Sequence, residues 1–246
     1  LSFAERHLPV PAVYAISDDG LCYLQEDLGS LSLFDFLKEG RESGGVYNEM
    51  EKNMLHQVMS ELPKFQFEAA SDYIYKHCYP LPAMDEQSVQ FDLNYFKYCY
   101  LKLTGMEFHE LSLEHDFQRL KKDLLAVEEQ AFMYRDFQAR NVMLKEGRPY
   151  YIDFQGGRRG PIYYDVASFL WQASAHYSDT LRSELIDTYL DGLQAYMKMD
   201  RGTFIQRLQL FVFFRTLQVL GAYGFRGLWE KKKHFIDSIP AALHKL

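Results

Sequence analysis

The sequence predicts an α+β fold in which a short β-rich segment precedes a longer, mostly helical region. Two apolar runs rich in Val, Ile and Tyr, at residues 13–16 and 21–25, flank a turn of about four residues and indicate a β-hairpin. From residue 32 onward, apolar side chains recur at three-and-four spacing, which is typical of amphipathic helices. Further apolar runs at 141–144 and 149–154 predict a second hairpin embedded among these helices.

The opening residues 3–8 fit the last turn of a helix, and Pro9 and Pro11 then stop that helix. An extended segment must follow, and the composition Ser-Asp-Asp-Gly at 17–20 favours a reversal between the first two strands. The chain begins with Leu1 rather than Met, and its first residues resemble the end of an element. We therefore expect a further segment upstream.

The helical region contains no internal repeat, low-complexity tract or long flexible linker. We therefore expect a boundary near Gly29 that acts as a hinge between two lobes, residues 1–29 and 30–246, rather than as a tether. The apolar run at 210–214 predicts a buried helix. Helices are expected at residues 32–38, 47–62, 92–103, 113–131, 165–175, 179–199, 203–222 and from about 229 onward.

Composition excludes several classes of function. The 246 residues carry 27 Lys and Arg against 34 Asp and Glu, a net charge of −7 that argues against non-specific binding to nucleic acid. Uninterrupted apolar runs are far shorter than the roughly 20 residues that span a bilayer, so no transmembrane segment is expected. The N-terminus lacks a signal-peptide pattern, which indicates the cytoplasm. The three cysteines, Cys22, Cys78 and Cys99, are predicted to be small core residues.

The residues that indicate chemistry are Asp136, Asn141 and Asp153. Transfer of a γ-phosphoryl group from ATP to a hydroxyl needs a carboxylate beside the acceptor and oxygen ligands that hold Mg²⁺ on the phosphates. The offset of five from Asp136 to Asn141 equals that in the catalytic loop of protein kinases, and it lets one short loop present both side chains to a cleft. Because a hairpin returns the chain to its starting end, we expect Asp153 beside Asn141.

With these residues the sequence resembles the aminoglycoside phosphotransferase and choline kinase family, which has the protein-kinase-like fold. Within that group it is most similar to bacterial kinases that phosphorylate N-acetylmuramate and N-acetylglucosamine at the anomeric hydroxyl. The resemblance extends from the first hairpin almost to the C-terminus. The motifs that carry it are Leu24 to Gly29, Arg135-Asp136-Phe137, Arg140-Asn141, Ile152 to Gln155, Gly160-Pro161, Tyr164-Asp165, Ser168, Arg215, Leu217 and Val219 to Gly221.

The resemblance implies a two-lobed protein-kinase-like fold, with only the end of the β-rich N-terminal lobe present and a mostly helical C-terminal lobe. It implies an ATP-dependent small-molecule kinase that phosphorylates a hydroxyl of a sugar or amino sugar. In that family the matching positions give the catalytic base, Asp136; the magnesium ligands, Asn141 and Asp153; the backbone hinge for the nucleotide, Glu26, Asp27 and Leu28; and a carboxylate that supports the catalytic loop, Asp165.

The sequence departs from the family in two places. Position 134 is Tyr where the family usually has His, but that position is one of packing and orientation, so we expect activity to survive. The family's glycine-rich phosphate loop and strand lysine should precede the first hairpin, and this sequence begins after that point. The remaining glycine-rich stretches, at 156–160 and 221–227, do not have the spacing of a phosphate loop.

Several residues have a plain structural alternative. Asp165 can serve as the N-cap of a helix that starts at Val166. Arg158 and Arg159 can clamp an anionic group of the substrate, although a solvated pair of loop arginines is the more common arrangement. Arg140 likewise suits an anionic acceptor, whereas the acidic balance of the chain suits a cationic one.

Two other functions fit the same residues. One is a choline, ethanolamine, homoserine or aminoglycoside kinase of the same fold. The other is a non-catalytic binding module, a pseudokinase that retains the metal-binding residues without a phosphate loop.

Overall fold

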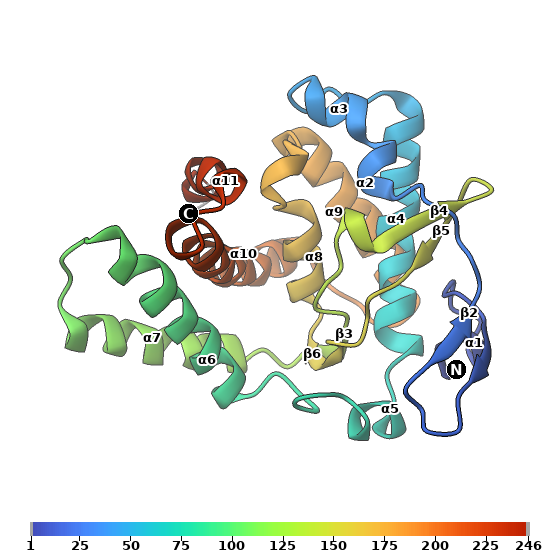
Figure 1. Cartoon of the computed structure of the whole chain (residues 1–246), viewed down its shortest axis with the longest axis horizontal. Helices are drawn as coiled ribbons and strands as arrows, with labels where there is room; N and C mark the ends of the chain where they lie inside the picture. Colours follow the sequence, from blue (N-terminus) through green and yellow to red (C-terminus); the bar gives the residue numbers. More distant parts are fainter. Residues whose placement is uncertain (1, 245–246) are drawn as a thin grey trace.

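The structure is a computed structural model that describes residues 2–244, and its architecture is α+β with helices predominating (Figure 1). The helices are α1 (Ser2–Glu5), α2 (Leu33–Phe36), α3 (Lys38–Glu42), α4 (Glu49–Glu68), α5 (Asp72–Lys76), α6 (Glu86–Phe96), α7 (Glu110–Leu125), α8 (Tyr163–Leu170), α9 (Asp179–Leu193), α10 (Arg201–Tyr223) and α11 (Lys233–Leu243). Two π-helical segments are η1 (Lys97–Leu101) and η5 (Gly224–Trp229), and the 3₁₀ turns are η2 (Lys102–Thr104), η3 (Ala139–Asn141) and η4 (Ala173–Ala175). The strands are β1 (Val13–Ile16), β2 (Tyr23–Gln25), β3 (Gln130–Met133), β4 (Val142–Lys145), β5 (Arg148–Tyr151) and β6 (Arg158–Pro161).

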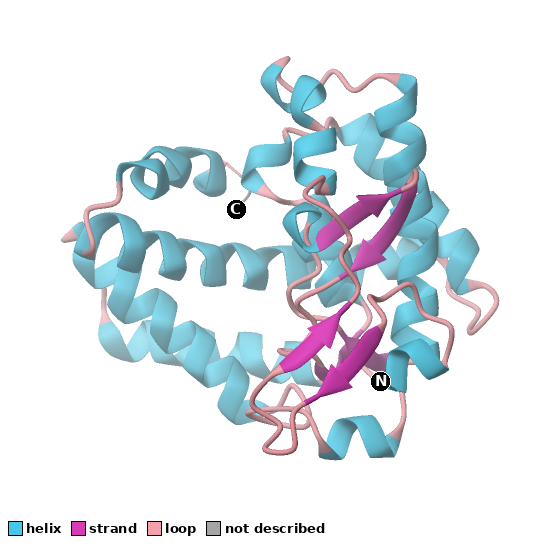
Figure 2. Cartoon of the chain, turned by 45° about the vertical axis from the view of Figure 1, so that its right-hand side comes forward, coloured by secondary structure: helices cyan, strands magenta, loops and turns pink. Residues whose placement is uncertain are grey.

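Across residues 2–244 the strands form three antiparallel pairs, β1–β2, β3–β6 and β4–β5. These pairs lie on one side of the helical core, while α6, α7, α10 and α11 extend away from them (Figures 1 and 2). Both predicted hairpins are confirmed. In the second hairpin Lys145 pairs with Arg148, and the two intervening residues have φ of 53° and 74°, a two-residue turn in which glycine occupies one position that favours it.

The β3–β6 pair was not predicted. Residues 113–131 were expected to form one helix, but α7 ends at Leu125, and β3 starts at Gln130. Strands of four residues are too short to establish a period, and β3 pairs with a strand that lies far along the chain, Met133 with Arg158 and Gln130 with Pro161. This pair matters because the residues that follow β3 form the candidate catalytic loop.

The long helices build the core. Helix α4 packs along α9, and α10 packs on α8 and α6. Asn48 and Glu51 form a capping box that satisfies free N–H groups at the start of α4. The predicted buried run in α10 is confirmed for most of its length, although Phe213 is 41% exposed. Large aromatic side chains fill the space between these helices, including Phe65, Tyr163, Tyr189, Phe204, Phe211 and Phe214.

Several helix ends differ from expectation. Helix α8 ends at Leu170 rather than at 175, α9 ends at Leu193 rather than at 199, and the final helix begins at Lys233 rather than near 229. Before that last helix the chain forms the π-helical segment η5. Gly224 starts it, and a Cβ atom at this position would stand 2.0 Å from the Cys99 carbonyl oxygen. The close approach of two helical backbones explains the glycine.

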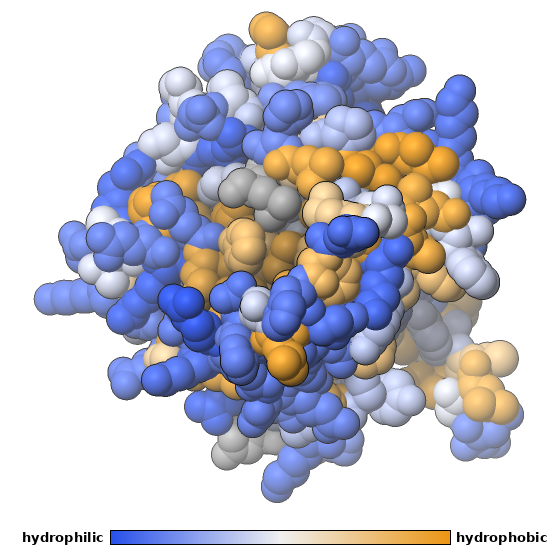
Figure 3. Space-filling model, turned by 90° about the vertical axis from the view of Figure 1, so that its left-hand side faces the viewer, coloured by the Kyte–Doolittle hydropathy of each residue, from blue (hydrophilic) through white to orange (hydrophobic). Residues whose placement is uncertain are grey.

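Residues Arg201–Trp229 form a helix long and apolar enough to cross a membrane by length and composition alone, and 56% of its most apolar stretch is buried inside the protein. That burial is the behaviour of a central core helix. The face that carries α6, α7 and α11 is mostly hydrophilic, with apolar side chains gathered around a hollow near its centre (Figure 3).

The interpretation of the cysteines as core residues is wrong for Cys22, which is exposed near the first hairpin turn, while Cys78 and Cys99 are partly buried.

Candidate active site

Asp165 of α8 stabilises the loop between β3 and β4 through hydrogen bonds to its backbone. This carboxylate is fully buried and accepts hydrogen bonds from the backbone N–H groups of Tyr134 at 2.7 Å and Arg135 at 2.8 Å. Burial raises the pKa of Asp165 to about 7, and the two backbone bonds oppose that rise because they stabilise the ionised form. Asp165 is the third residue of α8, so its interpretation as the helix N-cap is wrong.

The far end of the loop is held by Asn141. Its Nδ2 donates to the backbone carbonyl of Asp136 at 2.9 Å, and its backbone N–H donates to the Gln138 carbonyl at 2.9 Å. Arg135, directly before Asp136, has φ of 76°, a left-handed conformation that costs free energy and that the Asp165 bond supports. These bonds fix the backbone on both sides of Asp136, whose side chain is exposed to solvent.

The second hairpin places Asp153 beside Asn141. The Asn141 Nδ2 atom lies 3.4 Å from Asp153 Oδ2, and the Ile152 N–H donates to the Asn141 carbonyl at 3.0 Å. Asp153 also has a left-handed backbone, with φ of 64°, and its side chain is exposed. The structure thus brings Asp136, Asn141 and Asp153 together.

Tyr134 occupies the position where the family that the sequence resembles usually has His. It connects the loop after β3 with the segment that carries Asp153. Its hydroxyl donates to the Ile152 carbonyl, which links the loop to the residue before Asp153. The ring is buried among Phe65, Phe137 and Phe154. Desolvation raises the pKa of Tyr134 well above its ordinary value, so the phenol stays protonated and available as a donor.

Three arginines, Arg215, Arg135 and Arg158, lie near enough to Asp136 to lower the pKa of its carboxyl. Desolvation by neighbouring protein atoms raises the pKa of Asp136, and the charges of Arg215 and Arg135 oppose this rise. Arg135 also lies 3.8 Å from Asp92. Asp136 is therefore a partly desolvated carboxylate whose negative charge is stabilised by nearby arginines.

The expectation of a solvated arginine pair fails for Arg158. This side chain is 2% exposed, its Nε donates to the Gly156 carbonyl at 3.2 Å, and its Nη2 has no hydrogen-bond partner in the described structure. Burial lowers the pKa of Arg158, and the charge of Arg135 lowers it further. Arg159 is exposed, as expected, because β6 alternates the two side chains between opposite faces.

A cavity of about 740 Å³ opens beside Asp153. The first hairpin contributes Val13, Tyr23 and Gln25 to its walls, and Ile152 and Phe154 flank Asp153 on the other side. The mostly apolar lining with one carboxylate at its edge suits a ligand with a flat apolar part and a charged part.

The proposed hinge residues follow Gln25 directly. The Glu26 side chain accepts from Lys145 Nζ at 2.7 Å and from the Ala12 N–H at 3.2 Å, and the Asp27 carbonyl accepts from the same Nζ at 3.1 Å. Leu28 is buried. The Glu26 side chain is therefore committed to holding the segment in place. The Glu26 N–H donates to the Ala12 carbonyl at 2.7 Å, so the backbone groups of Glu26 and Asp27 left to meet a ligand are the Glu26 carbonyl and the Asp27 N–H.

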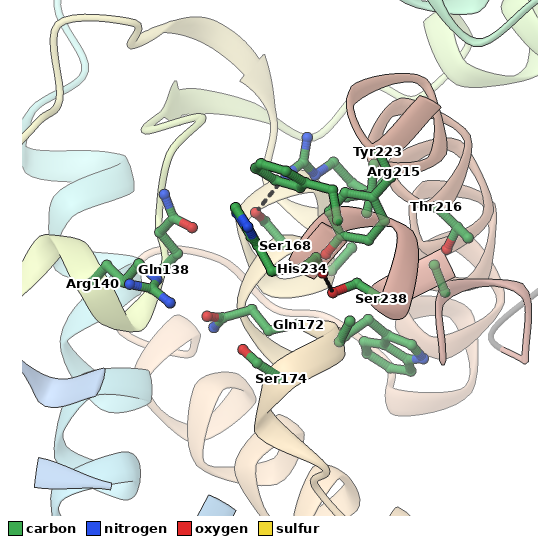
Figure 4. A pocket seen from close by; sticks show the side chains of 16 residues that line it. Gln138, Arg140, Ser168, Gln172, Ser174, Arg215, Thr216, Tyr223, His234 and Ser238 are labelled. Atoms are coloured by element: carbon green, nitrogen blue, oxygen red, sulfur yellow. Dashed lines mark hydrogen bonds between the residues drawn. The ribbon is translucent and has the colours of Figure 1, made fainter. Parts of the chain in front are cut away.

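A second cavity, of about 500 Å³, lies on the other side of the loop between α8, α10 and α11. Gln138 and Arg140, from the loop itself, form one wall (Figure 4). Arg215 and Tyr223 line the cavity across from them, and the Arg215 Nη2 donates to Ser168 at 3.1 Å. The candidate catalytic loop thus borders two cavities.

The donor atoms near Asp153 fit a magnesium ion. Asn141 uses Nδ2 for its side-chain hydrogen bonds, so Oδ1 is left as an oxygen donor, and the Asp153 carboxylate is open to solvent. Within residues 2–244 there is no cluster of three or more His, Cys, Asp or Glu residues that could hold a metal alone. Two protein oxygens with the remainder supplied by phosphates and water is a common arrangement for Mg²⁺.

Sequence reasoning missed the residues that α10 and α11 add to the second cavity, such as Tyr223, His234 and Ser238. It also missed Asp92, which receives a hydrogen bond from Gln218 and faces Arg135. No local motif marks these positions. They lie far from the loop in sequence, and only the packing of the helices brings them to it.

Known proteins resemble this chain in sequence. The sequence profile of the phosphotransferase enzyme family matches residues 1–200. The chain is 30% identical over 192 residues to the N-acetylmuramate/N-acetylglucosamine kinase of Neisseria meningitidis, a match that covers 76% of this chain and 53% of that protein. It is 38% identical over 91 residues to the kinase of the same name from Pseudomonas aeruginosa, covering 35% and 26%. The chain spans about half, or less, of the length of these relatives.

Solved structures share the fold. The ethanolamine kinase of Plasmodium vivax superposes with a TM-score of 0.63 at 12% identity, over 99% of this chain and 69% of that one. The choline kinase of Cryptosporidium parvum superposes with a TM-score of 0.63 at 11% identity, over 99% and 75%. The protein-kinase-like α+β fold expected from the sequence is therefore confirmed.

Proposed function

The chain belongs to the phosphotransferase enzyme family, and we propose on that premise that the protein transfers the γ-phosphoryl group of ATP to a hydroxyl of a sugar or amino sugar. The observation that carries this proposal is the position of Asp136, Asn141 and Asp153 between two cavities. One cavity includes Asp153 in its lining, and the other includes Gln138, two residues after Asp136. Such an arrangement suits a group that passes from one ligand to another.

In the proposed reaction Asp136 orients the acceptor hydroxyl and takes its proton. A bond forms between the acceptor oxygen and the γ-phosphorus while the bond from that phosphorus to the β–γ bridging oxygen breaks, and ADP leaves. Asn141 and Asp153 would hold Mg²⁺, which when bound neutralises negative charge on the phosphates. The Asp165 and Asn141 hydrogen bonds keep Asp136 in place throughout.

The nucleotide would occupy the larger cavity, with adenine against the backbone of Glu26 to Leu28. Lys145 supports this assignment because it ties the strand after the catalytic loop to Glu26 and Asp27. Residues 1–29 would then contribute the end of the β-rich lobe and the hinge, and residues 30–246 the helical lobe. We place the protein in the cytoplasm and expect no membrane partner. Its acidic composition argues against a nucleic-acid partner.

The lining of the second cavity favours a neutral or anionic acceptor over a cationic one. It includes two arginines and, among the described lining residues, no carboxylate. Choline, ethanolamine and aminoglycosides are cations, and their recognition calls for carboxylates or a cage of aromatic rings. Trp171, Tyr223 and Phe235 do supply aromatic rings to this lining, but the two arginine charges beside them oppose the binding of a cation. The names of the curated relatives point to N-acetylmuramate and N-acetylglucosamine as the first acceptors to test.

The test is ADP release by the full-length protein with Mg²⁺ and ATP, against N-acetylglucosamine, N-acetylmuramate, choline, homoserine and an aminoglycoside. We expect release that depends on one of the two amino sugars and that falls by about 10² to 10⁴-fold in Asp136→Asn. ATP binding should persist in that variant, because Asp136 is not among the lining residues of the larger cavity. Mg²⁺-dependent ATP binding without release in the presence of any acceptor would instead indicate a binding module.

A further inference from the structure

Two positive charges line the second cavity, and one of them, Arg215, also acts on the Asp136 carboxylate. Arg140 and Arg215 both line it, and neither is ion-paired with a carboxylate within the part of the chain that the structure describes. Lysines and arginines elsewhere, such as Lys97 with Glu114 and Arg207 with Glu129, are paired. Two unpaired guanidinium groups facing one concave space form an environment suited to an anion.

Arg140 is pre-positioned with its donors available. Its guanidinium stacks on the Phe34 ring at 3.8 Å from the centroid, and Arg41 stacks on the same ring at 3.5 Å. Stacking fixes the plane of a guanidinium but leaves its edge N–H groups unused, and that edge matches a carboxylate with two parallel hydrogen bonds. Arg140 is exposed and lies one residue before Asn141, so a group bound to it would lie close to the catalytic loop.

Arg215 has fewer free N–H groups than Arg140, but it orients a second donor, the Ser168 hydroxyl. Its Nη1 donates to Tyr164 and to Gln218, both at 2.9 Å, so both Nη1 hydrogens are committed. Its Nη2 donates to Ser168 at 3.1 Å, which leaves one hydrogen on Nη2. Because the Ser168 hydroxyl accepts that bond, its own O–H can donate into the cavity.

The far wall of the cavity comes from α11, which contributes His234, Phe235, Ser238 and Ala242. Both α10 and α11 follow residue 200, where the match to the family profile ends. The family profile therefore does not match this wall, although solved structures of the same fold superpose over 99% of the chain. A volume of about 500 Å³ accommodates a monosaccharide with its substituents, and it is within the range of small-molecule sites.

We propose that this cavity binds an acceptor carrying an anionic substituent, with Arg140 and Arg215 as the residues that recognise the anion and α11 as the wall that encloses it. This inference rests on the proposed kinase function and adds the charge class of its acceptor. The two arginines would bind an oxyanion. That oxyanion is either a carboxylate on the acceptor's sugar ring or the phosphoryl group in transfer, and the experiment separates these two sources.

The experiment measures kcat/KM of the full-length protein with two acceptors of the same ring, the anionic N-acetylmuramate and the neutral N-acetylglucosamine. We expect Arg140→Met to lower kcat/KM for the anionic acceptor about tenfold or more and to change it less than about threefold for the neutral one. The KM for ATP should stay constant. Arg140→Lys should restore part of the loss, because it keeps the charge but not the planar pair of donors.

The matched control is Arg119→Met, which removes one positive charge from the exposed face of α7, away from the cavity. We expect it to leave both acceptors unaffected. Equal loss for both acceptors in Arg140→Met would overturn the proposal and assign Arg140 to the phosphoryl group, and no loss for either would overturn it as well. Absence of turnover of both acceptors by the unmodified protein would instead refute the sugar kinase function. In that case, failure of N-acetylmuramate to bind the Mg²⁺-ATP complex in calorimetry would refute the anion site too.

Discussion

Asp165 accepts the backbone N–H of Arg135 at 2.8 Å, so a buried carboxylate at the start of α8 fixes the residue directly before Asp136. The same carboxylate accepts the Tyr134 N–H through its other oxygen. A carboxylate offers two acceptor atoms, and both N–H groups belong to a segment with an unfavourable left-handed residue. The strained loop conformation therefore depends on one side chain.

Replacing that side chain should loosen the loop. In Asp165→Asn only one side-chain oxygen remains, so one of the two buried N–H groups faces an amide nitrogen and loses its partner. We expect the free energy of unfolding to fall by about 1–3 kcal/mol and kcat to fall while nucleotide affinity is retained. Urea denaturation followed by steady-state kinetics measures both. Unchanged kcat in a folded variant would show that Asp165 does not position Asp136.

The proximity of Asp136, Asn141 and Asp153 could be predicted from sequence because it depends on local features, whereas the support from Asp165 comes from about thirty residues away. The five-residue offset from Asp136 to Asn141 and the hairpin between Asn141 and Asp153 are both short-range, and the turn at Glu146-Gly147 has residues that suit positive φ. Few alternative paths are open to so short a segment.

The rest of the site depends on long-range packing. The burial of Arg158 follows from the pairing of β6 with β3, and neither strand was expected. The second cavity exists because α10 and α11 pack near α8, and periodicity alone cannot decide which face of such helices meets the loop. The α10 helix is apolar over most of its surface, which removes the usual distinction between a core face and a solvent face.

Asp153→Ala should remove the Mg²⁺-dependent part of ATP affinity. The exposed carboxylate is one of two protein oxygens available to the ion, so we expect at least a tenfold weaker Kd for ATP in the presence of Mg²⁺ and no change in its absence. Calorimetry with and without Mg²⁺ makes the comparison. Because Asp153 has φ of 64°, alanine also introduces backbone strain there. Glu146→Ala, at φ of 53° in the β4–β5 turn, controls for that strain and should retain full affinity.

Arg215→Met should move the acid limb of the pH–rate profile to higher pH. Proton abstraction requires ionised Asp136, and the positive charge of Arg215 lowers the pKa of that carboxyl against the effect of burial. Removing the charge raises the pKa of Asp136, so kcat/KM should begin to fall at a higher pH as the solution is acidified. Arg140→Met is the control, since Arg140 is not among the charges that set this pKa. An acid limb at the same pH in Arg215→Met and the unmodified protein would contradict Asp136 as the base.

Lys145→Met tests the hinge assignment. Lys145 Nζ bonds Glu26 Oε1 at 2.7 Å and the Asp27 carbonyl at 3.1 Å, and so holds the backbone that is proposed to meet adenine. We expect the KM for ATP to rise up to about fivefold, the limit for a partly exposed ion pair, with little change in the KM for the acceptor.

Lys52→Met breaks a comparable pair with Glu49, 3.2 Å apart on α4, and should affect neither constant. The Lys145 ammonium hydrogen-bonds the segment that follows the first hairpin, and Lys145 is not among the described lining residues of the second cavity. A rise confined to the acceptor KM would therefore place the nucleotide elsewhere. A rise confined to the KM for ATP would instead support residues 26–28 as the hinge.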